Sequence, residues 1–455
     1  MPRGSSESSF RTKWSCASGT SQSRSTTALG TSAVSLRRGA GPVRRPIKPP
    51  GVLSVTTTPG ESPQKPLTIL IAADTYPPHI NGAAQFSFRL ATGMTARGHD
   101  VHVMACRADS GPMFTEKRDE ATVHRLRSRS VPTNEYFRIS LGWEIKKDIV
   151  ALFDVIKPDV VHVQSHYMIG GRVVSEARRR GIRIVATNHF MPENLNPFLP
   201  FPQWFKNVVG RVSWRDMGKV MSRADVVTTP TPLAAKAMHQ HAFLRKVLPL
   251  SNGIEVGNYE LAEGEVLEPN MYPTVMFAGR LAEEKHIDVL IDAIAKTPAE
   301  LNLHLVVVGG GEVKAALKAQ AEKLGLAGRV RFTGLISDAE LRDLYLKADL
   351  FVMPGTAELQ SLVTLEAMSA STPVILANAM ALPHLMEEGV NGYLFTPNDS
   401  NDLAEKITTI MRLSPEDRAA MGSASHSMVA RHGLAKTLDT FEAIYRGGSY
   451  EDYAV

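Results

Sequence analysis

The stretch DLFVMPGTAELQSLVTLEAM, at residues 349–368, is the part of this sequence that indicates the fold most clearly. Its first five residues predict a buried strand, a loop with Glu358 follows, and a helix carries Glu366 in its first turns. A loop carboxylate can accept hydrogen bonds from sugar hydroxyls, and the free N–H groups of a helix N-terminus attract phosphate. The second carboxylate can hold a further diol, such as a ribose. The stretch therefore predicts a site for a ligand that has hydroxyls at one end and an anion at the other, as a nucleotide sugar has.

The same strand–loop–helix rhythm extends outward from this stretch in both directions. Before residue 250, strands are predicted at 67–73, 100–106, 159–164, 182–186 and 225–229, and helices at 83–97, 168–180 and 232–241. After residue 273, strands are predicted at 274–278, 303–308, 330–333, 350–353 and 373–376, and helices at 286–296, 313–324, 402–413 and 415–445. This alternation predicts an α/β fold of two Rossmann-like, doubly wound domains that face a cleft, with ligands beyond the carboxyl ends of the strands.

The predicted domain organisation has five parts. A disordered basic tail spans residues 1–65, a first domain 66–250, a linker rich in Glu, Gly, Asn and Pro 251–272, and a second domain 273–430. The last part, 431–455, is predicted to pack back toward the first domain. The tail is a solvated extension, an upstream region included by a wrong start site, or an organelle transit peptide. The first two are favoured because the tail has no amphipathic Arg helix.

Charge and composition exclude several classes of protein. The net charge is +5, but residues 1–60 hold nine Lys and Arg against one Glu, so the tail carries +8 and the rest −3. Nucleic-acid binding is therefore not expected. Two cysteines make a disulfide framework improbable and indicate a reducing, cytoplasmic compartment. No apolar run is as long as a transmembrane helix.

Two cations follow the first strand of the second domain. Arg280 comes directly after that strand, and Lys285 lies five residues further on. Cations at this edge can stabilise the charge that grows on a diphosphate leaving group. The alternative is that both pair with Glu283 and Glu284 on a solvated turn. The two-carboxylate stretch favours the diphosphate interpretation.

Two glycine-containing turns are less specific. The run 309–311 follows a strand and suits a close backbone approach to a ligand, but Lys314 stands where a dinucleotide-binding pattern needs its last glycine. A nicotinamide dehydrogenase is therefore weakly supported. The turn Asn81-Gly82 is either an anion or sugar contact or simply a helix start. There is no Asp-x-Asp and no His/Cys cluster at metal spacing, so we expect neither a metal nor another cofactor.

Two histidines follow strands of the first domain and are predicted to face the cleft. His166 is favoured as a functional residue, whereas a functional and a structural role are equally weighted for His189, the acceptor-side candidate. Residues 198–219 combine Phe198, Trp204 and other aromatics with four cations. This composition suits a peripheral membrane contact. An ordinary helix that covers the first domain is the favoured alternative.

Together these motifs give the chain a recognisable pattern. It resembles the retaining glycosyltransferases of family 4, which have the GT-B fold, over about residues 67–445. The motifs that carry the resemblance are Tyr76-Pro77-Pro78 with Asn81-Gly82, the turn 98–101, Ser165-His166-Tyr167, the segment 251–254, Gly279-Arg280 with Lys285, and Glu358 to Glu366 followed by Ala367-Met368.

The resemblance implies roles for the site residues. Glu358 and His166 are the catalytic candidates, with Glu358 on the donor sugar's hydroxyls and His166 on the acceptor side. The implied donor-binding residues are Arg280 and Lys285 at the diphosphate with the N–H groups near Leu362 and Val363, Glu366 at the ribose, Gly334 near the base, and Asn81-Gly82. The reaction is expected to retain the anomeric configuration without a metal, and the leaving phosphate is expected to accept the acceptor's proton.

The chain departs from the family pattern between the two carboxylates. Leu359-Gln360-Ser361 stands where Gly-Phe-Gly is common, and we expect these bulkier residues to alter the sugar pocket. The donor is therefore left as a GDP- or UDP-hexose, with mannose or glucose favoured. The Glu-x-Gln form resembles relatives that glycosylate membrane lipids, which favours a glycolipid over a small-molecule acceptor, at the inner face of the membrane. A nucleotide-sugar epimerase and a non-catalytic nucleotide-sugar-binding protein remain alternatives.

Overall fold

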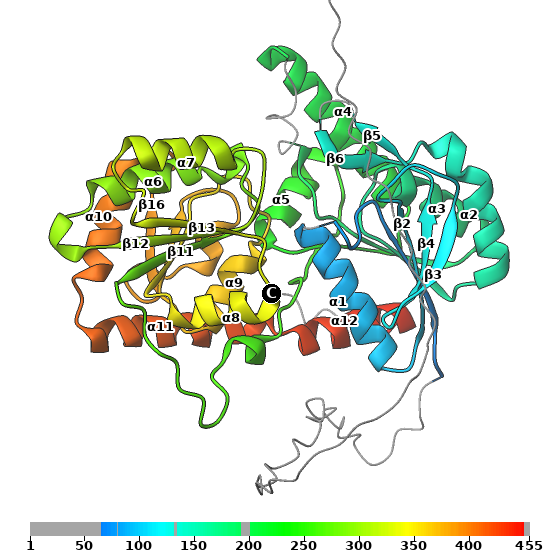
Figure 1. Ribbon diagram of the computed structural model, residues 1–455. Coiled ribbons are helices and arrows are strands. Elements are labelled where there is room, and N and C mark those ends of the chain that lie inside the picture. Colours follow the sequence, from blue (N-terminus) through cyan, green and yellow to red (C-terminus); the bar gives the residue numbers. More distant parts are fainter. Residues whose placement is uncertain (1–64, 80, 132–133, 193–200, 450–455) are drawn as a thin grey trace, which may run out of the picture. The chain divides into compact units, whose positions relative to one another are not determined.

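The computed structural model describes residues 65–79, 81–131, 134–192 and 201–449 (Figure 1). Residues 1–64 of the predicted tail lie outside these ranges, and so does Phe198. The described chain forms an eight-stranded sheet and a six-stranded sheet, together with a two-stranded hairpin of β5 (Arg129–Val131) and β6 (Asn134–Ile139). The predicted α/β fold with two parallel-sheet domains is confirmed.

The first sheet has the strand order β10-β9-β8-β7-β1-β2-β4-β3. Its strands are β1 (Thr68–Ala73), β2 (Asp100–Cys106), β3 (Phe114–Lys117), β4 (Thr122–Leu126), β7 (Val160–Val163), β8 (Arg183–Thr187), β9 (Val226–Thr229) and β10 (Leu248–Pro249). All described pairs are parallel except β3 with β4. Because β1 pairs with β2 on one side and β7 on the other, the winding reverses at β1, where such folds bind ligands.

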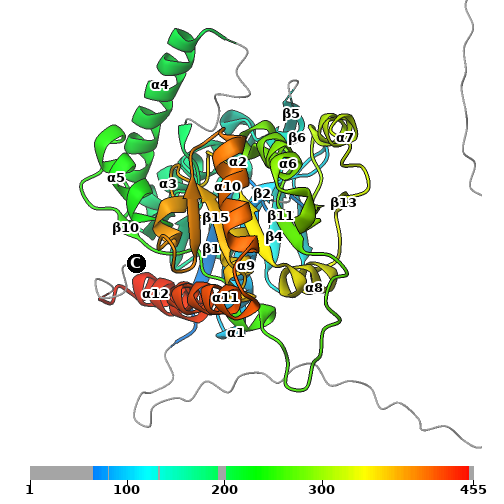
Figure 2. The ribbon, with the colours of Figure 1, turned by 90° about the vertical axis from the view of Figure 1, so that its left-hand side faces the viewer.

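Helices cover both faces of the first sheet. They are α1 (Gly82–Ala96), α2 (Gly142–Ile156), α3 (Met168–Arg180), α4 (Gln203–Met221) and α5 (Pro232–His241). Apolar side chains of α2, α3, α4 and α5 form the core on one face. The core on the other face comes from α1 and from α12 (Leu434–Arg446), at the other end of the chain. Figures 1 and 2 show α12 beside α1.

Helix α12 is bound to the first sheet by aromatic and polar contacts. Phe441 is fully buried, with its ring centroid 5.7 Å from that of Phe86 and 4.9 Å from that of His162. The Tyr445 hydroxyl lies 2.6 Å from Nδ1 of His162. The end of the described chain therefore completes the core of the sheet with which the fold begins.

The second sheet is parallel throughout, in the order β13-β12-β11-β14-β15-β16. Its strands are β11 (Thr274–Ala278), β12 (His304–Val308), β13 (Val330–Gly334), β14 (Leu350–Met353), β15 (Val374–Ala377) and β16 (Gly392–Phe395). Its helices are α6 (Ile287–Lys296), α7 (Lys314–Lys323), α8 (Asp338–Lys347), α9 (Leu362–Ser369), α10 (Ser400–Met411) and α11 (Pro415–Val429). The winding reverses between β11 and β14, which are neighbours in the sheet.

Some elements were not predicted. Residues 107–158 contain β3 to β6 and α2, and the short strand β3 has the polar sequence FTEK, which shows no apolar alternation. Helix α8 begins at a capping box formed by Ser337 and Glu340, a signal that the sequence does contain. The segment predicted as a linker begins buried. Ile254 belongs to the hydrophobic core of the second sheet, and its carbonyl accepts from the N–H of Leu434 at 2.8 Å.

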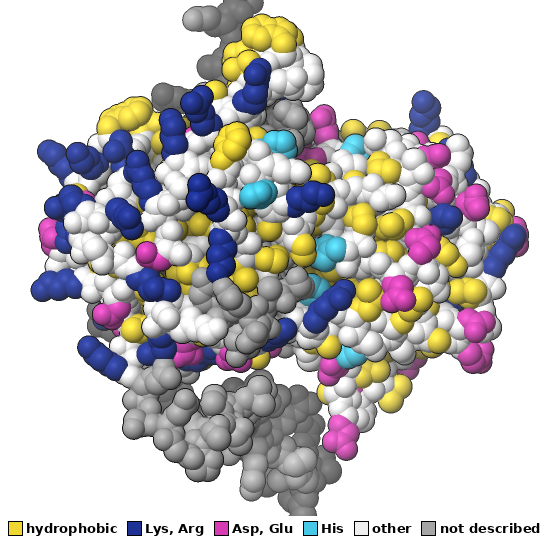
Figure 3. All heavy atoms as spheres, turned by 180° about the vertical axis from the view of Figure 1, so that it is seen from behind, with side chains coloured by type: hydrophobic (Ala, Val, Ile, Leu, Met, Phe, Trp, Pro, Cys, Tyr) yellow, Lys and Arg dark blue, Asp and Glu magenta, His cyan; other side chains and the backbone are white. Residues whose placement is uncertain are grey.

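The surface charge is divided between the two sheets. Residues 64–250 contain 26 Lys and Arg against 15 Asp and Glu, a net +11, whereas residues 251–455 contain 16 against 29, a net −13. Seen from behind, Lys and Arg gather over the left half of the molecule and Asp and Glu over the right half (Figure 3). The small net charge of the chain beyond the tail hides this asymmetry.

We expect Phe441→Ala to lower the free energy of unfolding by about 3–5 kcal/mol, because it leaves a cavity between α12 and the first sheet. Chemical denaturation followed by circular dichroism measures this effect. Phe243→Ala is the matched control, since that ring is 80% exposed. Equal losses of stability in the two variants would contradict the structural role of α12.

Candidate active site

Lys285 and Glu358 meet beyond the carboxyl ends of two neighbouring strands. Lys285 lies in the loop after β11 and Glu358 in the loop after β14, and their side chains form an ion pair. Met276 of β11 is in register with Phe351 of β14, which puts both loops at one edge of the sheet. Glu358 is 9% exposed, so the pair lies largely out of solvent. The cation expected at a diphosphate and the carboxylate expected at a sugar are thus in contact.

Arg280 has a different environment. It pairs with Glu284 of its own turn and lies 3.2 Å from a carboxylate oxygen of Glu312, with a half-exposed side chain. The interpretation of paired charges on a solvated turn therefore describes Arg280 but not Lys285. Arg280 remains on the rim of the same edge, held by two carboxylates.

Helix α9 presents its first N–H groups at this edge. Ser361, just before it, has a φ of +57°, and its hydroxyl lies 2.8 Å from that of Thr364. The N–H groups of Leu362 and Val363 have no acceptor among the residues that the structure describes. Two free donors and the positive end of the helix can receive phosphate oxygens.

Glu366, one turn further along α9, is already engaged. It is buried, with one oxygen 3.0 Å from Nη2 of Arg89 and the other 3.2 Å from the hydroxyl of Tyr345. Burial raises the pKa of Glu366, and the Arg89 guanidinium opposes that shift. A ribose at Glu366 therefore has to share or replace the Arg89 contact. Neither Arg89 nor Tyr345 was predicted, because both are ordinary helical residues in the sequence.

The glycine run after β12 serves contact between loops. A Cβ on Gly309 would lie 1.9 Å from the carbonyl oxygen of Gly279, and one on Gly311 would lie 2.2 Å from that of Leu281. Gly309 and Gly311 therefore allow a close approach to the loop after β11. Gly334, the candidate near the base, has a φ of +76°, and its carbonyl accepts from the N–H of Gly309 at 3.0 Å.

The unusual residues between the two carboxylates are used in packing. Leu359 packs against the core of the first sheet. Gln360 is 2% exposed and hydrogen-bonds to Ser251 and Asn252. Leu359 and Gln360 therefore hold the loop through contacts within the protein, and the expectation that they alter the sugar pocket stays a prediction.

The two histidines of the first domain differ in their partners. His166, after β7, is 2% exposed, its ring lies 4.1 Å from that of Tyr167, and neither ring nitrogen has a partner in the described part of the chain. Burial lowers the pKa of His166 to about 4, so the ring is neutral at pH 7. His189 has a partner, since its Nε2 lies 2.7 Å from Oε1 of Gln164. His166 therefore has both ring nitrogens left for a ligand, whereas one nitrogen of His189 is engaged.

Asn81 caps helix α1, as the helix-start interpretation expects. Its Oδ1 accepts from the N–H of Ala84 at 2.9 Å and lies 3.2 Å from the Thr75 hydroxyl. Gly82 is exposed, and a Cβ there would meet nothing within 4 Å. One residue beyond β1, Asp74 was not predicted as part of the site. Its carboxylate accepts from the Ser165 hydroxyl and from the N–H of Ile169 at 3.4 Å.

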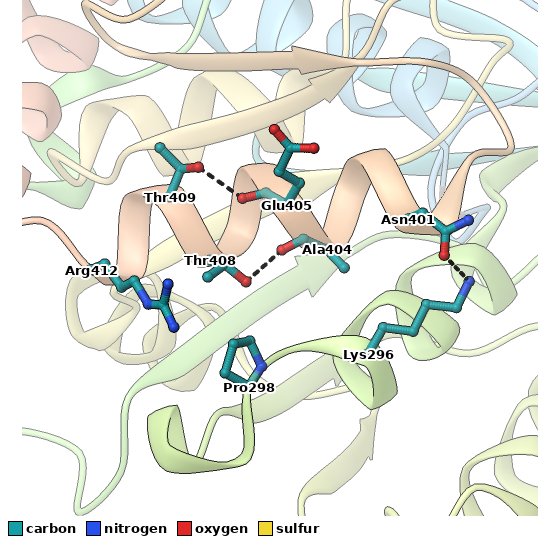
Figure 4. A pocket seen from close by; sticks show the side chains of 8 residues that line it. All are labelled: Lys296, Pro298, Asn401, Ala404, Glu405, Thr408, Thr409 and Arg412. Carbon is teal, nitrogen blue, oxygen red and sulfur yellow. Dashed lines mark hydrogen bonds between the residues drawn. The ribbon is translucent and has the colours of Figure 1, made fainter.

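Two other observations concern metal binding and a pocket away from these residues. No group of three or more His, Cys, Asp or Glu side chains in the described ranges is arranged to hold a metal ion. A pocket of about 430 Å³ lies beside α10 (Figure 4), and its Lys296 donates to Asn401 at 2.8 Å. None of its lining residues is a predicted site residue, so we assign it no part in the site.

The chain matches family models and curated relatives. Residues 80–258 match the model of Glycosyltransferase Family 4, and residues 260–428 match that of Glycosyl transferases group 1. The sulfoquinovosyl transferase SQD2 of Arabidopsis thaliana is 27% identical in an alignment of 323 residues, which covers 67% of this chain and 60% of that protein. A GDP-mannose-dependent alpha-mannosyltransferase of Mycolicibacterium smegmatis is 29% identical over 319 residues, 69% of this chain and 80% of that protein.

A solved structure shows the same fold. Sucrose-phosphate synthase from Thermosynechococcus elongatus superposes with a TM-score of 0.69 at 19% identity, over 83% of this chain and 98% of its own. The matched models are adjacent along the chain and together extend over both sheets. The chain therefore belongs to the family 4 glycosyltransferases and has their GT-B fold.

Proposed function

We propose that this glycosyltransferase moves a hexose from a nucleoside-diphosphate sugar to an acceptor hydroxyl, with retention of the anomeric configuration and without a metal. The observation that carries the proposal is the Lys285–Glu358 pair beside the free N–H groups at the start of α9. The carboxylate suits sugar hydroxyls, and the cation and N–H groups suit the adjoining diphosphate.

The chemistry follows from these positions. The bond between the sugar's anomeric carbon and the diphosphate oxygen breaks, and its electron pair goes to that oxygen, where Lys285 and the N–H groups of Leu362 and Val363 stabilise the charge. The acceptor oxygen bonds to the same carbon from the same face, and its proton passes to the leaving phosphate. His166, which is neutral and whose ring nitrogens both lack a partner among the described residues, hydrogen-bonds the acceptor or the sugar.

The donor sugar is proposed to be mannose or glucose, carried by GDP or UDP. The name of the Mycolicibacterium smegmatis relative supports GDP-mannose as one candidate. If the protein were instead a nucleotide-sugar epimerase, it would alter the nucleotide sugar with no acceptor present. Product analysis with and without an acceptor separates the two reactions.

The acceptor is proposed to be a glycolipid reached at the anionic, cytoplasmic face of a membrane. Trp204, Val208 and Val212 lie four residues apart along α4 and are 67%, 39% and 62% exposed. Arg211, Arg215 and Lys219 are exposed on the same helix, which lies within residues 64–250, whose net charge is +11. Exposed apolar and basic side chains on one helix suit binding to anionic lipid. None of the described helices is both long and apolar enough to cross a membrane.

We expect Lys285→Met to reduce kcat/KM for transfer about 100-fold or more, because the leaving diphosphate loses its main cation. The assay measures release of nucleoside diphosphate in the presence of acceptor. Lys296→Met is the matched control, since this lysine also binds neighbouring polar groups but lines the pocket of Figure 4. Wild-type transfer by a folded Lys285→Met variant would refute the site assignment.

We expect the protein to sediment with vesicles that contain phosphatidylglycerol but not with pure phosphatidylcholine vesicles. About 1 M salt should release it, because the Debye length then falls to about 3 Å. Trp204→Ser should weaken this binding. Trp143→Ser is the control, because Trp143 is 70% exposed at the start of α2. Absence of wild-type binding to anionic vesicles would contradict the membrane proposal but not the transferase proposal.

A further inference from the structure

Gln360 makes two hydrogen bonds from within the loop that joins β14 to α9. Its Oε1 accepts from the backbone N–H of Asn252 at 2.9 Å, and its Nε2 donates to the Ser251 hydroxyl at 2.6 Å. Because a backbone N–H can only donate, the amide oxygen has to face Asn252, which fixes the orientation of the side chain. The oxygen and the nitrogen of the Gln360 amide thus both have a partner, and the residue is 98% buried.

Ser251 is the centre of this contact. Its hydroxyl accepts from Gln360 and from the N–H of Gly253 at 3.2 Å, and lies 3.0 Å from Nδ1 of His432. A hydroxyl has one donor and two acceptor positions, so its own proton goes to His432. Its carbonyl accepts from the Thr437 hydroxyl at 3.1 Å. Ser251 is therefore fixed on every side, and Gln360 is bound to a rigid partner.

The same segment also reaches the other carboxylate of the site. Arg89 donates to the carbonyl of Gly253 at 3.4 Å and to Glu366 at 3.0 Å. Gln360 therefore joins the loop before α9 to residues 251–253. Arg89, from α1, joins the same residues to Glu366 in the middle of α9.

Directly after Gln360, the backbone enters an unfavourable conformation. Ser361 has a φ of +57°, a left-handed conformation that costs a non-glycine residue free energy and persists only where neighbours enforce it. This turn directs the chain into α9, where the N–H groups of Leu362 and Val363 have no acceptor in the described ranges. Gln360 is anchored at the position before the turn.

We propose that Gln360 is a positioning residue of the donor site. Its two hydrogen bonds to Ser251 and Asn252 hold the turn at Ser361, and so hold the start of α9 and Glu358 in the arrangement that receives a nucleoside diphosphate and its sugar. The inference rests on the proposed function, since it concerns how tightly the donor is bound. It also gives the departure of this loop from the common family pattern a physical role.

The test is calorimetric titration of the full chain with UDP and with GDP. Gln360→Met keeps the side-chain volume but removes both hydrogen bonds, and we expect it to weaken diphosphate binding about tenfold, the effect of one unsatisfied buried polar group. Gln320→Met is the matched control, because Gln320 also makes two hydrogen bonds, to Asp288 and Asp292, from α7. We expect this control to bind like the wild type.

A second variant keeps the test decisive if Gln360→Met fails to fold. Ser251→Ala removes only the hydroxyl, and we expect about threefold weaker binding, with no further loss when it is combined with Gln360→Met. Wild-type affinity in folded Gln360→Met, or in Ser251→Ala, would overturn the inference while leaving the transferase proposal intact. If the wild type bound neither nucleotide, the proposed donor itself would be wrong.

Discussion

Parallel strand pairing in the second sheet is the constraint on which the site depends. When every strand runs in the same direction, every loop that follows a strand lies at the same edge. The reversal of winding between β11 and β14 then makes neighbours of two loops that are 73 residues apart in sequence, and Lys285 and Glu358 form their ion pair there. The glycines at 309 and 311 let the loop after β12 approach the same edge without a steric clash.

The protein itself pairs the charges of the site. Lys285 holds Glu358, and Arg89 with Tyr345 holds Glu366, so neither buried carboxylate is left without a partner. An unpaired buried charge costs several kcal/mol, and pairing avoids that cost until a ligand brings its own phosphate and hydroxyls. A nucleotide sugar offers replacements for both pairs. Its diphosphate can pair with the cations, and its hydroxyls can donate hydrogen bonds to the carboxylates.

The sequence indicated those parts of the structure that depend on local pattern. The strand–loop–helix rhythm predicted both parallel-sheet domains, and the stretch at 349–368 predicted a loop carboxylate next to a helix start. Arg89 could not be predicted, since its partner Glu366 is 277 residues away and nothing on α1 sets it apart. The partners of Gln360 were missed for the same reason. Strand β3 was missed because its polar residues show no alternation, whereas the capping box of α8 was a readable signal.

A crystal structure of the protein with UDP or GDP tests the central claim most directly. We expect a diphosphate between Nζ of Lys285 and the N–H groups of Leu362 and Val363, with the ribose at Glu366 and the contact of Glu366 to Arg89 shared or replaced. A diphosphate bound at another place, such as the pocket beside α10, with Lys285 still paired only to Glu358, would contradict it.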